Sequence, residues 1–317
     1  MLWLLSKIFH FVTSLRNTLY DIGLLPTYRS PLTVVCIGNV VVGGSGKTPL
    51  VQHFIEDFQK QGRRPVVLSR GYKGRLQGPI QVAPGHTAEE VGDEPRMLAS
   101  LNSVPVVVAK SRVKGARWIE SNNLGDVILL DDGYQHRALC RDMNVLTFGI
   151  RDGVVLESLE GNRLLPFGLL RESLSQALTR ATHIVFHHRG PKLPPELVRR
   201  AQKSIGTRSV DFHMWESGGK VTLNGKKIEP QEIIAFCGIA RPEGFFESLR
   251  SAGFLLAECV VYQDHQKYTE EELTQLKTQR PDRILVCTEK DFVRIPKSWQ
   301  SHFAVFHPRY VCGSGEL

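Results

Sequence analysis

The strongest chemical signal in this sequence is a glycine-rich segment that runs directly into a lysine and a threonine at residues 43–48. Backbone N–H groups of such a loop can surround the phosphates of a nucleotide, the lysine can reach the β- and γ-phosphates, and the threonine hydroxyl can bind Mg²⁺. The segment therefore predicts a nucleoside-triphosphate site that serves transfer of the terminal phosphoryl group. The residues assigned to this site are Val41, Val42, Gly43, Gly44, Ser45, Gly46, Lys47 and Thr48.

The loop departs from the usual pattern but has the flanks that the pattern requires. The consensus G-x-x-x-x-G-K-[ST] has glycine at the position that Val41 occupies here. A β-branched run at residues 33–37 precedes the loop, and a helical pattern begins at Pro49, a residue suited to the first turn of a helix. The positive end of that helix's dipole favours a phosphate. This context favours a phosphate-binding loop over a chance glycine turn.

A second candidate element is a pair of acids at the end of an apolar run. Residues 127–130 are apolar, and Asp131, Asp132 and Gly133 follow them. In P-loop enzymes a strand of this kind delivers a carboxylate to the metal ion, although paired acids at a strand end are also common turn residues. With a phosphate loop upstream in a parallel sheet the metal interpretation is favoured. The predicted metal ligands are therefore Thr48, Asp131 and Asp132.

Other polar residues could act on the nucleophile. Gln135 and His136 follow the acid pair, so they belong to the same strand end. Asp93 lies in a predicted turn between elements at residues 92–95, where an acid could accept the proton of an attacking hydroxyl. His265 follows Asp264 far along the chain. By local spacing alone Asp93 is one of many loop acids and His265 a single surface histidine, so their roles stay open at this point.

The elements that must position these residues indicate an α/β fold. Short, uninterrupted apolar runs alternate with helix-like stretches, which predicts a parallel sheet covered by helices on both faces. Near residue 210 the pattern changes to alternation around Asn224-Gly225, which is typical of a β-hairpin. Predicted strands before this point lie at residues 33–37, 65–68, 104–109, 127–130, 145–148 and 183–186. Beyond it, strands are predicted at about 233–237, 256–262 and 283–287, with helices at about 242–252 and 270–276.

These predictions divide the chain into four parts. Residues 1–25 form an amphipathic helix, residues 26–210 a P-loop domain, residues 211–230 a β-hairpin linker, and residues 231–317 a smaller α/β domain. A length of 317 residues agrees with two domains that each bury a core.

The first 25 residues have two interpretations. Apolar residues recur every three or four positions, which lines one face of a helix, but polar residues interrupt the run well short of the length that crosses a bilayer. The segment also lacks the features of a secretory signal, so we expect it to stay on the mature protein. The helix packs either on its own domain or on a membrane surface. The membrane interpretation is favoured by Trp3, Phe9, Phe11, Lys7 and Arg16.

Composition narrows the partners. Forty Lys and Arg residues against 32 Asp and Glu residues give a formal charge of +8, which favours anionic partners such as phosphates or acidic lipids. The basic residues are scattered, and the sequence has neither an RNA-binding aromatic signature nor zinc-finger spacing, so no nucleic acid partner is expected. The six cysteines stand far apart and indicate reduced core residues, not metal ligands or disulfides.

Taken together, the motifs resemble those of the tetraacyldisaccharide 4'-kinase family of lipid A biosynthesis. The resemblance rests on GNVVVGGSGKTP at residues 38–49, LSRGY at 68–72, GDEP at 92–95, DDGYQH at 131–136, LLPFGLLRE at 164–172, CGIA at 237–240, DHQKY at 264–268 and TEKD at 288–291. It thus extends over residues 1–310, and the family's loop likewise lacks the first glycine. The chain departs from the family pattern at Phe167, Leu169 and Gln266.

The resemblance implies a reaction and a set of residues. ATP and Mg²⁺ would phosphorylate the 4'-hydroxyl of an acylated glucosamine disaccharide 1-phosphate at the cytoplasmic face of the bacterial inner membrane, where the protein would be peripheral on the anionic surface. The implied fold is a P-loop domain joined by a two-stranded linker to a smaller α/β domain that contributes to the active site. Implied catalytic residues are Lys47, Asp93 as the base, and His265, which would reach Asp93 from the other domain when the domains close. Further candidates are Gln135, His136, Arg70, Arg112, Arg171 and Glu172.

Two rival functions stay open from the sequence. One is a P-loop kinase of a soluble metabolite, with the first helix packed on the protein. The other is a P-loop switch or transport ATPase, in which water is the nucleophile and hydrolysis drives a partner. Detergent-dependent activity on an acylated acceptor opposes the first rival, and steady hydrolysis without lipid supports the second.

Overall fold

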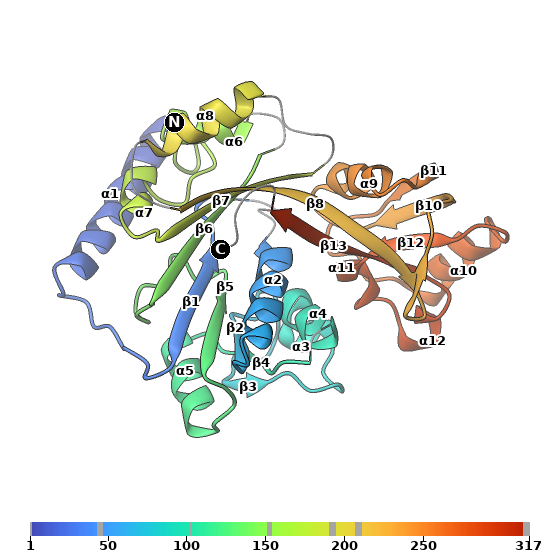
Figure 1. Ribbon diagram of the computed structural model, residues 1–317, viewed down its shortest axis with the longest axis horizontal. Coiled ribbons are helices and arrows are strands. Elements are labelled where there is room, and N and C mark those ends of the chain that lie inside the picture. Colours follow the sequence, from blue (N-terminus) through green and yellow to red (C-terminus); the bar gives the residue numbers. More distant parts are fainter. Residues whose placement is uncertain are drawn as a thin grey trace.

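A single β-sheet runs through the described chain, which comprises residues 2–42, 47–101, 103–150, 154–189, 195–206 and 211–312 of this computed structural model (Figure 1). The N-terminal strands are β1 (Thr33–Gly38), β2 (Pro65–Ser69), β3 (Ile80–Gln81), β4 (Val106–Val108), β5 (Val127–Asp131), β6 (Met143–Gly149) and β7 (His183–Arg189). Their helices are α2 (Lys47–Lys60), α3 (Ala88–Val91), α4 (Asp93–Leu101), α5 (Arg112–Ser121), α6 (Val154–Glu160), α7 (Leu174–Leu178) and α8 (Pro195–Ile205). The strands predicted in this part are all confirmed.

This N-terminal part is a parallel sheet with helices on both faces. Apart from the edge strand β3, its strands pair in parallel. Neighbouring residues of β1 enter different cores: Val34 packs in a core that includes Ile119 of α5, and Val35 in a core that includes Leu50 of α2. Both faces of the central strand β1 are therefore buried, which explains why its sequence is an unbroken apolar run.

The C-terminal part repeats this architecture on a smaller scale. Strands β10 (Glu232–Cys237), β11 (Leu255–Val261) and β12 (Leu285–Thr288) are parallel. The helices are α9 (Pro242–Ser251), α10 (Glu270–Thr278), α11 (Glu289–Phe292) and α12 (Lys297–Gln300). Ile233 packs with Phe245 of α9, and its neighbour Ile234 packs with Leu273 of α10. The predicted strands and the two predicted helices of this part are confirmed.

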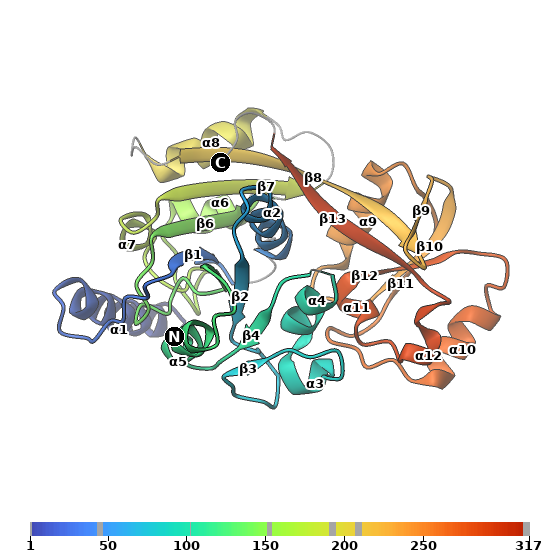
Figure 2. The same ribbon diagram turned by 60° about the horizontal axis from the view of Figure 1, so that its bottom comes forward.

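Two long strands join the parts, and they differ from the expected hairpin at residues 211–230. Strand β8 (Asp211–Leu223) pairs in parallel with β7 and then antiparallel with β13 (Ala304–Cys312), which also pairs with β12 (Figure 2). The Asn224-Gly225 turn exists, with φ angles of 51° and 79°, but it leads only to the short β9 (Lys226–Ile228). The second joining strand therefore comes from the far end of the chain. Its sequence contains Pro308, which cannot donate to a ladder and hides the strand pattern.

The resulting strand order is β11-β10-β12-β13-β8-β7-β6-β1-β5-β2-β4-β3. Strand β1, which leads to the glycine loop, lies between β5 and β6. The carboxyl ends of parallel strands meet at one edge of a sheet, so the residues after β1 and after β5 are brought together there.

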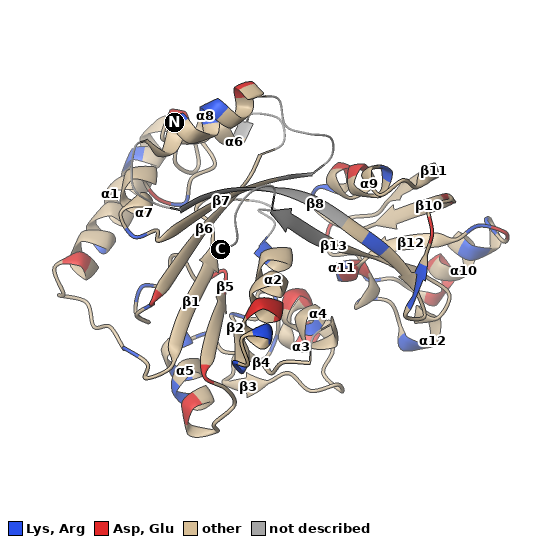
Figure 3. Cartoon of the chain, viewed as in Figure 1, with Lys and Arg blue, Asp and Glu red and all other residues tan. Residues whose placement is uncertain are grey.

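Helix α1 (Leu2–Asp21) lies against the N-terminal part (Figure 1), and the side chains that it buries there are polar. Its buried residues are Ser6, Thr13 and Asn17, whereas Trp3 is 58% exposed and Phe11 68% exposed. The prediction that the helix packs on its own domain is therefore met, but mainly through polar side chains, and most of its large apolar side chains stay exposed. Figure 3 shows few charged residues along α1. Among the described residues, none of the helices has the length and apolarity needed to cross a membrane.

Candidate active site

A cavity of about 460 Å³ lies between the two parts, at the carboxyl edge of the parallel strands. Its walls include residues of α2 and α4 from the N-terminal part and of the α11 region from the C-terminal part. Many of the sequence-predicted residues meet here, namely Lys47, Thr48, Asp93, Asp132, Arg171 and His265. The cavity is thus lined by side chains that are far apart in the sequence.

The phosphate-loop prediction falls partly outside the described residues. The structure does not describe Gly43, Gly44, Ser45 and Gly46, so only the residues on either side of them can be placed. On the near side the Val42 N–H donates to the carbonyl of Leu169 at 2.9 Å, and Val41 is buried and bridges to Leu170. On the far side α2 begins at Lys47.

A close backbone approach holds β1 against the loop that follows β5. A Cβ added at Gly38 would lie 2.8 Å from the Cβ of Tyr134, so a larger residue would push the two segments apart. The Asn39 side chain donates to the carbonyl of Val41 at 2.7 Å, and the side chain of Gln135 donates to the carbonyl of Asn39 at 2.8 Å. Gln135 therefore supports the start of the loop from behind and does not line the cavity.

The two acids after β5 lie in different environments. Asp131 is only 2% exposed and accepts a hydrogen bond from the Ser69 hydroxyl at 3.2 Å. Burial, followed by the negative charges of Glu94 and Asp132, raises the pKa of the Asp131 carboxyl to about 7. Asp132 has a left-handed φ of 50° and lines the cavity. Both acids were predicted as metal ligands, with no choice between them, but of the two only Asp132 lines the cavity.

Two cations of the cavity flank Asp132. The Nζ atom of Lys47 lies 3.5 Å from Oδ1, and a guanidinium nitrogen of Arg171 lies 3.4 Å from Oδ2. Oδ1 is buried and accepts no hydrogen bond from the described residues. The carboxylate is therefore a negative centre between two positive ones, with one oxygen incompletely satisfied.

Asp93 and His265 meet across the cavity. The predicted turn at residues 92–95 is wrong, because Asp93 is the first residue of α4, and Gly92, with a φ of 93°, ends α3 just before it. The His265 Nδ1 atom lies 2.6 Å from Oδ2 of Asp93. An ionised carboxylate can only accept, so Nδ1 carries the proton of this hydrogen bond. Helix α4 thus presents Asp93 to a histidine of the C-terminal part.

Two residues that the sequence did not single out also reach α4 from the C-terminal part. Arg294 donates to Oδ2 of Asp93 through two nitrogens, at 2.7 and 3.1 Å. Lys290 pairs with Glu94, and this positive charge lowers the pKa of the Glu94 carboxyl. Lys290 belongs to the TEKD motif, and Arg294 follows its last residue, Asp291, by three positions. That helical spacing was the signal that could have revealed Arg294.

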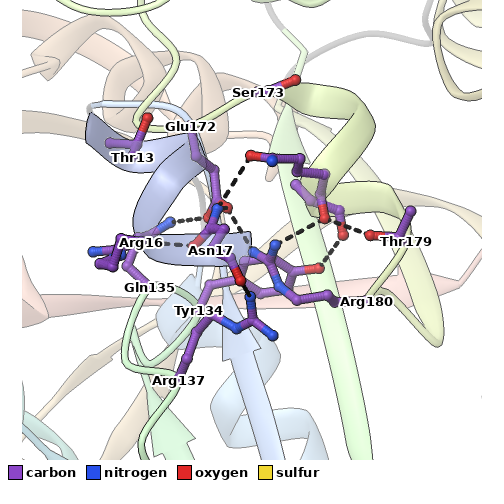
Figure 4. Close-up of polar contacts among 12 residues, drawn as sticks. Thr13, Arg16, Asn17, Tyr134, Gln135, Arg137, Glu172, Ser173, Thr179 and Arg180 are labelled. Atoms are coloured by element: carbon purple, nitrogen blue, oxygen red, sulfur yellow. Dashed lines mark hydrogen bonds and ion pairs between the residues drawn. The ribbon is translucent and has the colours of Figure 1, made fainter. Parts of the chain in front are cut away.

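Glu172 is fully buried in a polar network behind the cavity (Figure 4). Its Oε2 accepts from Arg180 at 2.6 Å and from Asn17 of α1 at 2.9 Å, and its Oε1 accepts from Gln135 at 3.2 Å. The preceding residue, Arg171, lines the cavity. Helix α1 is therefore bonded to a segment that carries cavity residues on its other side.

A cationic cluster that includes Arg16 of α1, Arg70, Arg112 and Arg141 lies outside the cavity. Arg112 is 3% exposed, and burial, opposed by Asp131 but aided by Arg70, lowers the pKa of its guanidinium to about 10. Burial and the charges of Arg112, Arg141, Arg70 and Arg16 lower the pKa of His136 to about 4. Buried nitrogens of this cluster find no hydrogen-bond partner in the part of the chain that the structure describes, namely Nε of Arg16, Nε of Arg112 and Nε2 of His136.

The fold and the cavity together define the class of protein. A parallel sheet whose central strand leads through a glycine loop into a helix, with a carboxylate from the adjacent strand beside the loop lysine, is the arrangement of P-loop phosphotransferases.

The comparisons narrow this class to one family. The profile of the family described as Tetraacyldisaccharide-1-P 4'-kinase matches residues 1–312. The chain is 35% identical over 294 residues to the tetraacyldisaccharide 4'-kinase of Shewanella piezotolerans, covering 92% of this chain and 83% of the relative. It is 36% identical to that of Shewanella sediminis, covering 92% and 80%. The solved structure of LpxK from Aquifex aeolicus, described as in complex with ATP, has a TM-score of 0.76 at 28% identity and covers 97% of this chain and 93% of that one.

This chain therefore belongs to the tetraacyldisaccharide-1-P 4'-kinase family. The resemblance drawn from the motifs and the P-loop type of α/β fold are both confirmed.

Proposed function

We propose that this chain transfers the γ-phosphoryl group of ATP to the 4'-hydroxyl of a tetraacylated glucosamine disaccharide 1-phosphate. One observation carries this proposal: Asp93 and His265 meet 2.6 Å apart in the same cavity as Lys47 and Thr48. A nucleotide site and a candidate base in one cavity fit transfer to a hydroxyl. The family's name supplies the identity of the acceptor.

The nucleotide would lie along the start of α2. Lys47 would hold the β- and γ-phosphates, and the N-terminal end of the helix would add its partial positive charge. The Thr48 hydroxyl and Asp132 would hold Mg²⁺, because both line the cavity, Oδ1 of Asp132 accepts no hydrogen bond from the described residues, and hard oxygen donors suit this ion. When bound, the ion would neutralise charge on the phosphates. Asp131, buried behind Asp132, would act only through its neighbour.

Asp93 would accept the proton of the acceptor hydroxyl as the hydroxyl oxygen attacks the γ-phosphorus and ADP leaves. His265 would orient the carboxylate through the Nδ1 hydrogen bond. Because His265 comes from the C-terminal part, a complete base exists only while the two parts are together. Water that enters an open cavity would then meet a nucleotide without an assembled base.

The cationic cluster of Arg16, Arg70 and Arg112, together with the neutral imidazole of His136, would bind the phosphate of the acceptor. It offers buried N–H groups without partners, and a guanidinium is suited to a phosphate. It lies beside α1, which fits an acceptor that arrives from a lipid surface. Arg171, on the cavity wall, is close enough to Asp132 to act on the nucleotide instead.

Helix α1 would bind the cytoplasmic face of the bacterial inner membrane. Its outward side chains are apolar, and Lys7, whose Nζ lies 5.3 Å from the centre of the Trp3 ring, fits the boundary between acyl chains and anionic headgroups. The protein would thus be peripheral, with its cationic cluster near the headgroups.

The test is an assay with ATP, Mg²⁺ and the acylated disaccharide 1-phosphate in detergent, read by mass spectrometry of the lipid. We expect one added phosphate, no product with Lys47→Ala, and little product with Asp93→Asn. A de-acylated disaccharide that serves equally well would favour the soluble-metabolite rival. Steady ATP hydrolysis without any acceptor, together with no lipid product, would overturn the proposal in favour of a switch or transport ATPase.

A further inference from the structure

Arg294 occupies a fixed position between the two parts of the molecule. Its side chain is 5% exposed. Besides Asp93, it donates through NH1 to the carbonyl of Gly238 at 2.8 Å and lies 3.4 Å from Oδ1 of Asp291. A guanidinium whose nitrogens are taken on several sides has little freedom to turn.

The partner Asp291 is itself held in place. It is fully buried and accepts hydrogen bonds from the Gly238 N–H at 2.8 Å, the Tyr268 hydroxyl at 2.9 Å and the Thr288 hydroxyl at 2.6 Å. Arg294 therefore stands on a rigid support built by the C-terminal part, and this support includes the TEKD motif that no assigned role explains.

Among the described residues, the side-chain hydrogen bonds to Asp93 converge on one of its oxygens. His265 Nδ1 at 2.6 Å and the two nitrogens of Arg294 at 2.7 and 3.1 Å all lie at Oδ2. Within the part of the chain that the structure describes, Oδ1 of Asp93 has no hydrogen-bond partner. The carboxylate is thus anchored at one oxygen and open at the other, while its residue lines the cavity.

We propose that Arg294 is the positioning residue for Asp93: together with His265 it holds Oδ2, so that Oδ1 is the atom that faces the acceptor hydroxyl. This inference rests on the proposed function, in which Asp93 is the base. It goes further because it assigns a role to Arg294 and distinguishes the two carboxylate oxygens.

The proton balance of the step agrees with this assignment. The acceptor O–H bond breaks, its proton passes to Oδ1, its oxygen forms a bond to the γ-phosphorus, and the bond from that phosphorus to the bridging oxygen breaks, with its electron pair leaving on ADP. Asp93 becomes neutral in this step. Arg294 does not lose its only counter-charge, because Asp291 stays beside it.

A simpler alternative is that the Arg294–Asp93 ion pair is only one of several that hold the two parts together. Lys267 and Glu89 form another such pair, and their side chains are 77% and 68% exposed. Lys267→Met is therefore a matched control: it removes a cation that spans the parts without touching Asp93, and an exposed pair contributes little.

The experiment compares Arg294→Met, Arg294→Lys, Lys267→Met and Asp93→Asn in the full chain, with ATP and the acylated disaccharide 1-phosphate in detergent. We expect Arg294→Met to lower kcat by about 100-fold, the lower end of what a positioned general base contributes. The KM for ATP should not change. Arg294→Lys should recover about tenfold of this loss, because an ammonium keeps the charge but not the two-pronged geometry. Lys267→Met should match the wild type.

Further measurements separate position from folding and from the base itself. The double variant Asp93→Asn/Arg294→Met should be no slower than Asp93→Asn, because both changes act on one group. Wild-type kcat in Arg294→Met, or equal loss in Arg294→Met and Lys267→Met, would overturn the inference. If Arg294→Met does not fold, Arg294→Lys alone still tests the inference. Wild-type turnover in Arg294→Lys would contradict the need for two guanidinium nitrogens at Asp93. Normal turnover in Asp93→Asn would instead remove the proposed base, and Arg294's role with it.

Discussion

Replacing Asn17 by leucine should loosen α1 from the catalytic part without weakening its contact with lipid. Asn17 is fully buried, and its amide donates to Oε2 of Glu172 at 2.9 Å and to Gln176 at 3.4 Å. Leucine has a similar volume but no donor. The Glu172 carboxylate keeps its bonds from Arg180 and Gln135 and loses one, and the long, weaker bond from Asn17 to Gln176 is lost as well.

A hydrogen bond to a charged group contributes about 1.5–3 kcal/mol, so we expect α1 to open more easily by about 2 kcal/mol. Each 1.4 kcal/mol is a factor of about ten, and amide hydrogens of α1 should therefore exchange about 30-fold faster. Hydrogen exchange followed by mass spectrometry measures this directly. The global unfolding midpoint should fall less, because α1 can detach before the sheet unfolds.

Thr18→Leu is the matched control, because Thr18 is the next residue of α1 and its side chain is exposed. Exchange in α1 that is equally fast in both variants would refute the assigned role of the Asn17–Glu172 bond. Vesicle binding gives the second arm: both variants should bind as the wild type does, because the outward apolar side chains are unchanged. Loss of vesicle binding in Asn17→Leu alone would mean that docking on the protein and on lipid are one event.

The remaining predictions concern the lipid contact of α1, the cationic cluster and the Lys290–Glu94 pair. Phe11→Ser should weaken vesicle binding by up to about 100-fold, since burying the 68% exposed ring is worth about 3 kcal/mol at ~25 cal/mol/Å²; unchanged co-sedimentation would contradict a lipid contact at α1. Arg112→Met should raise the KM for the lipid acceptor and not that for ATP, as steady-state kinetics with each substrate varied would reveal; an effect on ATP alone would move the cationic cluster to the nucleotide. Lys290 lowers the pKa of Glu94, so this pair stabilises the fold above the ordinary glutamate value of 4.5 and the contribution disappears as the pH falls below it. Glu94→Gln should therefore destabilise at pH 7 and flatten the acid side of a thermal-unfolding profile, and an unchanged profile would mean that the pair is solvated.

The phosphate loop and the acids after β5 were predictable because their chemistry is local. Lys47 and Thr48 follow a strand and begin a helix, and Asp132 follows the adjacent strand, so parallel pairing alone brings them together. What spacing could not give is the difference between Asp131 and Asp132. Asp131 is the last residue of β5 and is buried in the interior, whereas Asp132 follows it with a left-handed φ of 50° and lines the cavity.

The contacts across the cavity were beyond local spacing. Asp93 lies 172 positions from His265 and 201 positions from Arg294. The first pair entered only through the family resemblance, and Arg294 did not enter at all, because a single arginine three residues after the TEKD motif looks like an ordinary surface charge. Likewise, periodicity identified the two faces of α1 but not which of them points inward. That choice depends on Glu172, a buried carboxylate that requires a donor such as Asn17.

The linker explains why the base is divided between the two parts. Strands β8 and β13 pair over residues 215–222 and 305–312, and this two-stranded ribbon connects the C-terminal part, which also reaches α3 and α4 through charged pairs. Two strands alone make a less rigid connection than a wide sheet. Asp93 stays with α4, and both of its Oδ2 partners travel with the C-terminal part. Separation would therefore leave the carboxylate unoriented, and hydroxyl activation would be coupled to closure over the acceptor.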